Sequence, residues 1–213
     1  MRNKDEYVLL ARVYDPLMGP MNAGLIRIAL KMTDPARGAR VLDVACGTGA
    51  SAAAFVEAGC IVSGLDSSPA MLAVAKKKLA DKAEIILGDA TQMPFAGGSL
   101  DLATITLVLH EMDAPVRERV LAECARVLAP GGRLMAIDYQ DGPLAGIKGR
   151  FMRTVTFLIE RMVGGAHYRN YREFLSSGCL PALLFRAGWT IEKQRILSGG
   201  NLAALVAVPS RNS

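Results

Sequence analysis

The sequence lacks any hydrophobic stretch long enough to cross a membrane. Its longest uncharged apolar run, residues 102–109, is far shorter than the roughly 20 residues that a transmembrane helix needs. The opening residues, MRNKDEYVLL, also lack the apolar segment of a signal peptide. We therefore expect a cytoplasmic protein without a transmembrane segment; transient contact with a membrane surface is left open.

Cysteine and histidine are scarce. The chain has four cysteines and two histidines, and no two cysteines form a C-x-x-C pair. This pattern excludes a disulfide framework and a zinc knuckle, so we expect reduced thiols.

The sequence also has too few charged residues for a disordered chain. Hydrophobic residues make up 51% of its 213 residues and charged residues 21%, which is typical of a globular domain. The net charge of +5 arises after residue 139, where 10 Lys or Arg residues face 4 Asp or Glu residues. This basic third fits an anionic substrate, a membrane surface or nucleic acid, although spaced arginines also occur on ordinary surfaces.

Short apolar segments alternate with helical patterns in the middle of the chain. Strands are predicted over residues 40–44, 61–65, 84–87, 100–106 and 133–139. Between them, residues 69–80 follow Ser68 as an N-cap, and residues 116–128 follow Asp113 and stop before Pro130-Gly131-Gly132. The alternation predicts a doubly wound α/β fold, a parallel sheet with helices on both faces.

The remaining segments divide a single predicted domain further. Residues 1–37 are predicted as an N-terminal lid of two helices, and residues 38–141 as the ligand-binding core. Residues 142–187 form a helical cap and the last helix, and residues 188–213 a terminal antiparallel hairpin.

The first predicted strand runs into the glycine loop VLDVACGTGA, residues 41–50. Gly47 and Gly49 allow a tight turn and close approach of a ligand, and the next helix begins with free amide donors. The dehydrogenase pattern G-x-G-x-x-G is broken by Ala52, and the Gly-Lys-Ser/Thr of a Walker loop is absent.

Acidic residues follow the next two strands. Asp66 lies 23 residues after Asp43, where an acidic side chain typically binds ribose hydroxyls, and Asp89 follows the third strand. Each also has a structural explanation, as a helix cap or a turn residue. Because the ends of parallel strands share one edge, together they predict a nucleoside site that fits adenine.

These motifs together resemble those of class I S-adenosylmethionine-dependent methyltransferases. The matching segments are VLDVACGTG, GLDSSPAML, GDATQMPFAGGSLD and VLAPGGRL, within residues 40–139. Their order is most similar to the ubiquinone/menaquinone-biosynthesis type of small-molecule methyltransferase (methyltransferase type 11), including the early pair Tyr14-Asp15. The resemblance implies a seven-stranded, mostly parallel Rossmann-like sheet with a reversed last strand. Ala45 departs from the pattern, because many relatives have glycine there.

The resemblance also implies the site residues. Asp43 and the loop would face the methionine part of S-adenosylmethionine, Asp66 the ribose, and Asp89 with Ala90 the adenine. The full set implied for the cofactor is Asp43, Ala45, Cys46, Gly47, Thr48, Gly49, Asp66, Ser67, Met71, Asp89, Ala90 and Leu107. S-adenosylhomocysteine would be the product.

Catalysis is less evident in the sequence. In-line methyl transfer needs alignment and exclusion of water, and an acceptor that loses a proton also needs a base. His110, at the end of the fourth strand, is the predicted base, although a structural histidine also fits. Candidate substrate contacts are Tyr7, Tyr14, Met18, Tyr139, His167 and Tyr168. Asp138 and Asp141 have no third ligand at a suitable spacing, so no metal is expected.

We therefore predict an enzyme that methylates a small molecule, quinol-like, phenol-like or anionic, with no nucleic-acid partner. Two alternatives stay open: an RNA or protein methyltransferase, and a protein that binds S-adenosylmethionine without catalysis. The identity of the acceptor atom, and whether the protein is a monomer or a homodimer, do not follow from the sequence.

Overall fold

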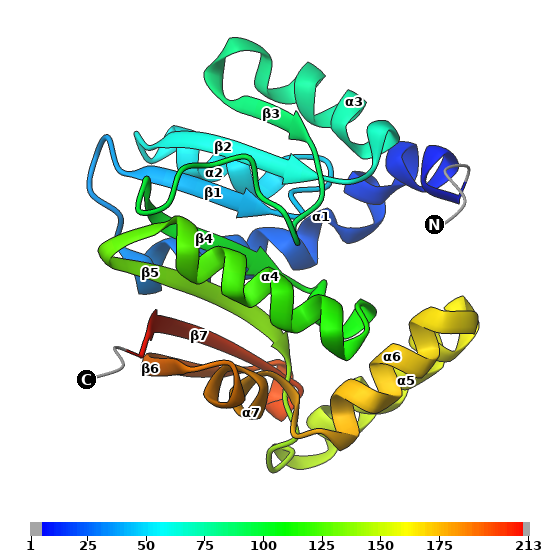
Figure 1. Ribbon diagram of the computed structural model, residues 1–213. Helices are drawn as coiled ribbons and strands as arrows, with labels where there is room; N and C mark the ends of the chain where they lie inside the picture. Colours follow the sequence, from blue (N-terminus) through cyan, green and yellow to red (C-terminus); the bar gives the residue numbers. More distant parts are fainter. Residues whose placement is uncertain (1–5, 211–213) are drawn as a thin grey trace. The chain divides into compact units, whose positions relative to one another are not determined.

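The computed structural model describes residues 6–210; for residues 6–14, 16–18 and 148 it describes the backbone only. Seven strands form one sheet in the order β3-β2-β1-β4-β5-β7-β6 (Figure 1). The strands are β1 Arg40–Val44, β2 Ile61–Asp66, β3 Glu84–Leu87, β4 Leu100–Thr106, β5 Leu128–Tyr139, β6 Trp189–Leu197 and β7 Leu202–Pro209. Strand β7 is antiparallel to both β5 and β6, so the predicted doubly wound sheet with a reversed C-terminal strand is confirmed.

Helices follow most of the strands. The α-helices are α1 Glu6–Thr33, α2 Ala50–Glu57, α3 Pro69–Leu79, α4 Ala114–Val127, α5 Gly146–Val163, α6 Gly165–Ser176 and α7 Cys179–Arg186. The short 3-10 helices are η1 Ala80–Lys82, η2 Leu109–Glu111 and η3 Ser198–Gly200. Over residues 6–210, no helix has the length and apolar character to span a membrane.

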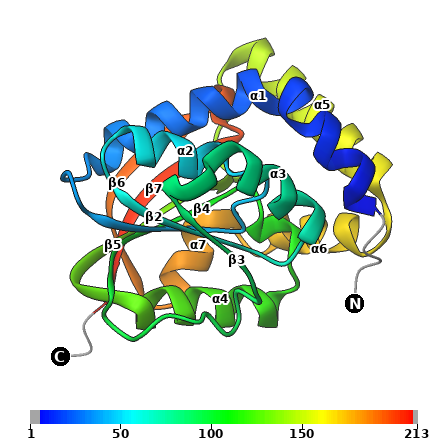
Figure 2. The same ribbon diagram turned by 90° about the horizontal axis from the view of Figure 1, so that it is seen from above.

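The chain forms two compact units, and the first runs to Thr104 and includes Arg126–Gly132. Its strands β1, β2 and β3 are parallel, with Asp43 paired to Gly64 and Asp66 paired to Leu87. Helices α1, α2 and α3 pack against one another, and α2 and α3 pack on these strands (Figure 2). The carboxyl ends of β1 and β2 therefore lie side by side.

Helix α3 begins as the sequence predicts. Ser68 is the N-cap and its hydroxyl accepts a hydrogen bond from the Met71 N–H at 3.3 Å, while Pro69 occupies the first turn. Leu72 and Leu79 are buried on one face of the helix. This apolar stripe fixes α3 against the sheet.

The second unit comprises Ile105–Ala125 and the chain from Arg133 onward. Helix α4 starts where Asp113 accepts a hydrogen bond from the Val116 N–H at 2.9 Å, as expected of an N-cap. Strands β5, β7 and β6 form the antiparallel end of the sheet, and α7 packs on β6 and β7. The predicted terminal hairpin is thus confirmed.

Two predicted boundaries were wrong. Residues 6–33 form one helix rather than two. The φ of proline is compatible with a helix, and a helix that packs against other elements tolerates the loss of one backbone hydrogen bond. Leu25 and Ala29 are buried along the second half of this helix. Strand β5 begins at Leu128 and includes Pro130-Gly131-Gly132, so it is longer than the predicted strand over residues 133–139.

Candidate functional site

The loop between β1 and α2 has the backbone that its glycines suggested. Gly47 has φ 54° and Gly49 has φ 74°, a region that favours glycine, and Ala45 shares it with φ 55°. A Cβ at Gly47 would meet no atom within 4 Å, whereas one at Gly49 would lie 2.8 Å from Cδ1 of Leu79. Gly47 therefore faces open space, and Gly49 is needed for packing against α3.

Asp66 joins this loop to the end of β2. Its carboxylate accepts hydrogen bonds from the N–H of Gly47 and the N–H of Ser68, both at 2.8 Å. Two carboxylate oxygens offer about four lone-pair sites, so capacity remains for the two hydroxyls of a ribose. Asp66 is half-buried, which leaves it accessible to such a ligand.

Asp43 lies at the end of β1 and is 3% exposed. Its carboxylate accepts hydrogen bonds from the Thr104 hydroxyl at 2.8 Å and the Ala52 N–H at 3.1 Å. Burial raises the pKa of Asp43 to about 6, although these hydrogen bonds oppose the rise. A buried carboxylate at the start of α2 is costly to keep ionised, as expected of a binding residue.

Asp15 ties α1 to the same loop. It accepts a hydrogen bond from the Thr48 hydroxyl at 2.6 Å and forms an ion pair with Lys78 of α3 at 2.7 Å. Burial raises the pKa of Asp15, but the hydrogen bonds outweigh it and the net shift is downward. The early Tyr14-Asp15 pair therefore places one acidic side chain at the glycine loop.

The other predicted cofactor residues occupy varied positions. Asp89 is exposed after β3 and accepts hydrogen bonds from the N–H and hydroxyl of Thr91, both at 2.8 Å. Met71 is buried in α3, Cys46 is buried in the loop, and Ser67 is exposed. The first unit thus brings most of the predicted set to the ends of β1, β2 and β3.

Leu107 and Ala90 complete the predicted cofactor set. Leu107 belongs to the second unit, where its N–H donates to the Ile137 carbonyl at 2.8 Å and its φ is 52°. Ala90 follows Asp89 and is half-buried. The open space at Gly47 and the spare acceptor sites of Asp66 fit S-adenosylmethionine, which supplies an electrophilic methyl group when bound.

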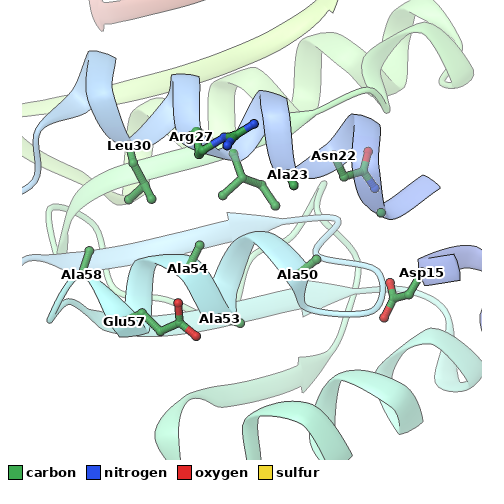
Figure 3. A pocket seen from close by; sticks show the side chains of 12 residues that line it. Asp15, Asn22, Ala23, Arg27, Leu30, Ala50, Ala53, Ala54, Glu57 and Ala58 are labelled. Atoms are coloured by element: carbon green, nitrogen blue, oxygen red, sulfur yellow. The ribbon is translucent and has the colours of Figure 1, made fainter. Parts of the chain in front are cut away.

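A cavity of about 580 Å³ lies between α1 and α2 (Figure 3). Alanines of α2 line one side, and Arg27 and Leu30 of α1 line the other. Among the residues whose side chains the structure describes, the lining includes Asp15 and Ala50 near the glycine loop but none of the predicted site residues. Its lining is mixed, because it includes Asn22 and Glu57 beside the apolar residues.

The second unit contains a buried cluster around His110. Nδ1 of His110 donates a hydrogen bond to Asp138 at 2.7 Å, and its Nε2 lies 3.6 Å from Oε1 of Glu160. Burial lowers the pKa of His110, but the carboxylates of Asp138, Glu111 and Glu160 together outweigh burial and raise the pKa to about 8. Both ring nitrogens of the predicted base therefore face carboxylates, and the residue is only 3% exposed.

His167 joins the same cluster from α6. Its Nε2 donates a hydrogen bond to Oε2 of Glu160, and its Nδ1 lies 3.8 Å from Oε2 of Glu111. Burial raises the pKa of Glu160, but the hydrogen bond from His167, the electrostatic interaction with His110 and the hydrogen bond from Tyr139 together lower the pKa. Glu160 is thus held as a carboxylate between the two histidines.

Aromatic side chains enclose the cluster. The Tyr139 hydroxyl donates a hydrogen bond to Glu160 at 2.8 Å, and the ring centroids of Tyr139 and His110 are 4.7 Å apart. Tyr171 and Phe174 contact His110 edge-on, whereas Tyr168 packs against Phe157. Of the predicted substrate contacts, Tyr139 and His167 lie in the cluster and Tyr168 beside it. Tyr7, Tyr14 and Met18 have side chains outside the described part of the chain.

Arg117 holds the turn that carries His110. It is 1% exposed, and its Nε donates to the carbonyls of Leu109 and Met112, both at 2.9 Å. Its other nitrogens bind the Asn170 carbonyl at 3.0 Å and the Glu173 carboxylate at 2.6 Å. The buried guanidinium therefore fastens η2 to α6.

Sequence reasoning missed Glu111, Glu160 and Arg117. Asp138 and Asp141, which the sequence analysis considered together, have separate partners: Asp138 pairs with His110, and Asp141 pairs with Arg153 at 3.3 Å. One signal was available: the chain has only two histidines, and each has a glutamate nearby, at the next position or seven positions earlier. That signal alone did not show that η2, α5 and α6 meet.

Comparison with known proteins identifies the family of the chain. Residues 42–136 match the family model described as "Methyltransferase domain". The chain is 34% identical to a demethylmenaquinone methyltransferase of Beutenbergia cavernae, covering 91% of this chain and 85% of that protein. It is 31% identical to a ubiquinone/menaquinone biosynthesis C-methyltransferase of Methylobacterium nodulans, covering 90% and 84%.

Solved structures share the fold. A putative methyltransferase of Haloferax volcanii, in complex with the Trm112 methyltransferase activator, superposes with a TM-score of 0.73 at 19% identity, covering 97% of this chain and 99% of that one. A 1,6-didemethyltoxoflavin-N1-methyltransferase of Burkholderia thailandensis gives 0.67 at 18% identity, covering 98% and 87%. The chain belongs to the S-adenosylmethionine-dependent methyltransferases, in the family that includes the ubiquinone/menaquinone-biosynthesis enzymes.

Proposed function

We propose that this enzyme methylates a quinol-like small molecule. The observation that carries the proposal is the extent of the similarity. The alignment with the demethylmenaquinone methyltransferase covers 91% of this chain. The aligned region is therefore longer than residues 42–136 and includes most of the helical segments that we predict to select the acceptor.

The cofactor is proposed to bind along the ends of β1, β2 and β3. In this arrangement Asp66 accepts hydrogen bonds from the ribose and the loop around Gly47 faces the methionine part. Asp89 and Ala90 would lie at the adenine. The register that aligns Asp43 with Gly64 and Asp66 with Leu87 supports this order, because it aligns the strand ends that precede all three loops.

An apolar acceptor is supported by the surface of α5. Ile147, Phe151 and Met162 are 87%, 64% and 86% exposed on this helix. Exposed apolar side chains of this size commonly mark a binding surface. The apolar tail of a quinol, or transient contact with the membrane that holds it, would cover them.

The reaction is an in-line displacement at the methyl group, and a ring carbon or hydroxyl that accepts the methyl also loses a proton. The proposal that His110 receives this proton stays a prediction. Its Nε2 faces Glu160 at 3.6 Å, so direct proton transfer from an acceptor requires the cluster to open.

The test is an incubation of the purified protein with methyl-labelled S-adenosylmethionine and a panel of demethylated quinols, phenols and small anions. Mass spectrometry of the products should show label in a quinol, with one S-adenosylhomocysteine formed for each methyl group transferred. The matched control is Gly47→Val, which should block the cofactor loop and abolish labelling.

The two alternatives predict different outcomes. Label recovered in RNA or protein from a cell extract, with none in small molecules, would overturn the proposed acceptor class. Tight cofactor binding without turnover on any acceptor would indicate a non-catalytic binding protein instead.

A further inference from the structure

The two histidines of the chain, 57 positions apart in the sequence, meet in one buried cluster. Their ring centroids are 5.8 Å apart, and both rings face the Glu160 carboxylate. We propose that this cluster is a binding site for a divalent transition-metal ion, held by His110, Glu111 and His167 with Glu160 as the fourth ligand.

The ligand atoms already converge. One atom each of His110, Glu111 and His167 lie within 4.8 Å of one another, and Oε1 of Glu160 lies 3.6 Å from Nε2 of His110. Ligands at zinc distances of 2.0–2.1 Å are roughly 3.3 Å apart in a tetrahedral site. Side-chain rotations that move these atoms by about one ångström therefore complete the set.

His110 is oriented as a metal-binding histidine. Its Nδ1 is engaged by Asp138 at 2.7 Å, and Asp138 also accepts from the backbone N–H of His110 and of Tyr139. A carboxylate on one ring nitrogen fixes the tautomer and directs the lone pair of the other nitrogen toward the cation. In His110 the other nitrogen is Nε2, which faces Oε1 of Glu160 at 3.6 Å.

The protein holds the turn that carries two of the ligands in place. The Asn170 side chain donates to the Glu111 carbonyl at 2.6 Å, and Arg117 binds the carbonyls on both sides of His110 and Glu111. These contacts fasten η2 to α6, which carries His167. Such a rigid support is what a preorganised metal site requires.

Charge and donor chemistry indicate the class of metal. Asp138 and Glu160 are buried carboxylates, and a divalent cation would balance the negative charge that they bring together. Two imidazole nitrogens with carboxylate oxygens suit zinc, iron or manganese, whereas calcium and magnesium prefer oxygen ligands alone.

The proposal concerns binding and stands apart from the identity of the acceptor. A cation on Nε2 of His110 would occupy the lone pair that a general base uses. The site is therefore an alternative to the prediction that His110 is a base, and its test needs no methyl acceptor.

The experiment uses untagged protein, because a histidine tag would add ligands. After treatment with a chelator, the protein is loaded with ZnCl₂ or CoCl₂ and passed through a desalting column, and its metal content is measured by mass spectrometry. We expect one equivalent of zinc, a rise in Tm on loading, and a visible Co²⁺ spectrum without thiolate charge-transfer bands.

Variants assign the ligands. His167→Ala and Glu111→Gln should each weaken zinc binding at least 10-fold, whereas the control Glu118→Gln, on the exposed face of α4, should bind as the wild type does. Circular dichroism establishes that each variant is folded.

Three outcomes would overturn the proposal. These are a wild-type protein that retains no zinc, undiminished binding in both ligand variants, and a thiolate spectrum, which would place the metal at cysteines. The first outcome is measured on the wild type, so the proposal can be refuted even if His167→Ala does not fold.

Discussion

The Thr48 hydroxyl donates a hydrogen bond of 2.6 Å to Asp15, which joins the glycine loop to α1. Asp15 also pairs with Lys78 of α3 at 2.7 Å. One carboxylate thus connects two helices to the loop that is proposed to hold the cofactor. We infer that the position of the first half of α1 and cofactor binding are coupled.

Removal of residues 1–20 tests whether this segment acts as a lid. The protein should still fold, because Leu25, Ala29 and Met32 bury the second half of α1. Cofactor affinity should change less than about tenfold, but methyl transfer should slow at least about 100-fold, since water is no longer excluded. Hydrogen exchange of the intact protein should slow in residues 6–20 when S-adenosylhomocysteine is added. Full activity of the truncated protein would contradict the lid.

The two loop glycines should serve different purposes: Gly47 should be needed for cofactor binding and Gly49 for stability. Gly47→Val should abolish cofactor binding, because its branched side chain enters the open space proposed for the cofactor and the positive φ strains the loop. Gly49→Ala should instead lower the free energy of unfolding by roughly 1–3 kcal/mol, because its Cβ would lie 2.8 Å from Leu79. Cys46→Ala should bind the cofactor normally. Calorimetry and urea unfolding measure both effects, and the reverse ranking would refute this description of the loop.

Asp43 should destabilise the fold once it is ionised. The pKa of Asp43 in the native state is raised to about 6, whereas the unfolded state has the ordinary value of about 4. Between about pH 4 and pH 6, Asp43 is therefore protonated in the native state and ionised in the unfolded state. The stability contributed by the protonated form is therefore lost as pH rises through this window. Relative to the wild type, Asp43→Asn should gain about 1–3 kcal/mol between pH 4 and pH 7, while cofactor affinity falls. Urea unfolding across this range would disprove the assignment if the difference stayed constant.

The His110 cluster should act as a unit. His110→Ala should lower kcat by about 100-fold or more with cofactor affinity unchanged. We expect His167→Ala to cause a comparable loss, because both rings share the Glu160 carboxylate. A loss confined to His110→Ala would identify a direct base, and near-normal rates in both variants would assign the histidines a structural role.

Much of the first unit followed from local sequence patterns. Short apolar runs predicted the bounds of β1 and β3, and Ser68 marked the start of α3. In the second unit, Asp113 marked the start of α4 in the same way. These features depend on neighbouring residues alone. The extent of α1 does not, because a helix that contains proline persists only when tertiary packing compensates.

The candidate site divides in the same way. The glycine loop and Asp66 could be predicted because their spacing follows from one β-α-β unit. The cluster in the second unit could not, since Glu160 and His167 meet His110 only after α5 and α6 fold back on η2. Arg117 was equally hidden, because a buried arginine looks like any surface arginine of an amphipathic helix.

Calorimetric titration of S-adenosylhomocysteine into the wild-type protein and into Asp66→Ala tests the central claim most directly. We predict one site per chain in the wild type and an affinity about 10- to 100-fold lower in the variant, corresponding to roughly 1.5–3 kcal/mol of charge-assisted hydrogen bonds. Circular dichroism should show the variant folded. No binding by the wild type, or equal affinity in a folded Asp66→Ala protein, would contradict the assignment of the cofactor site.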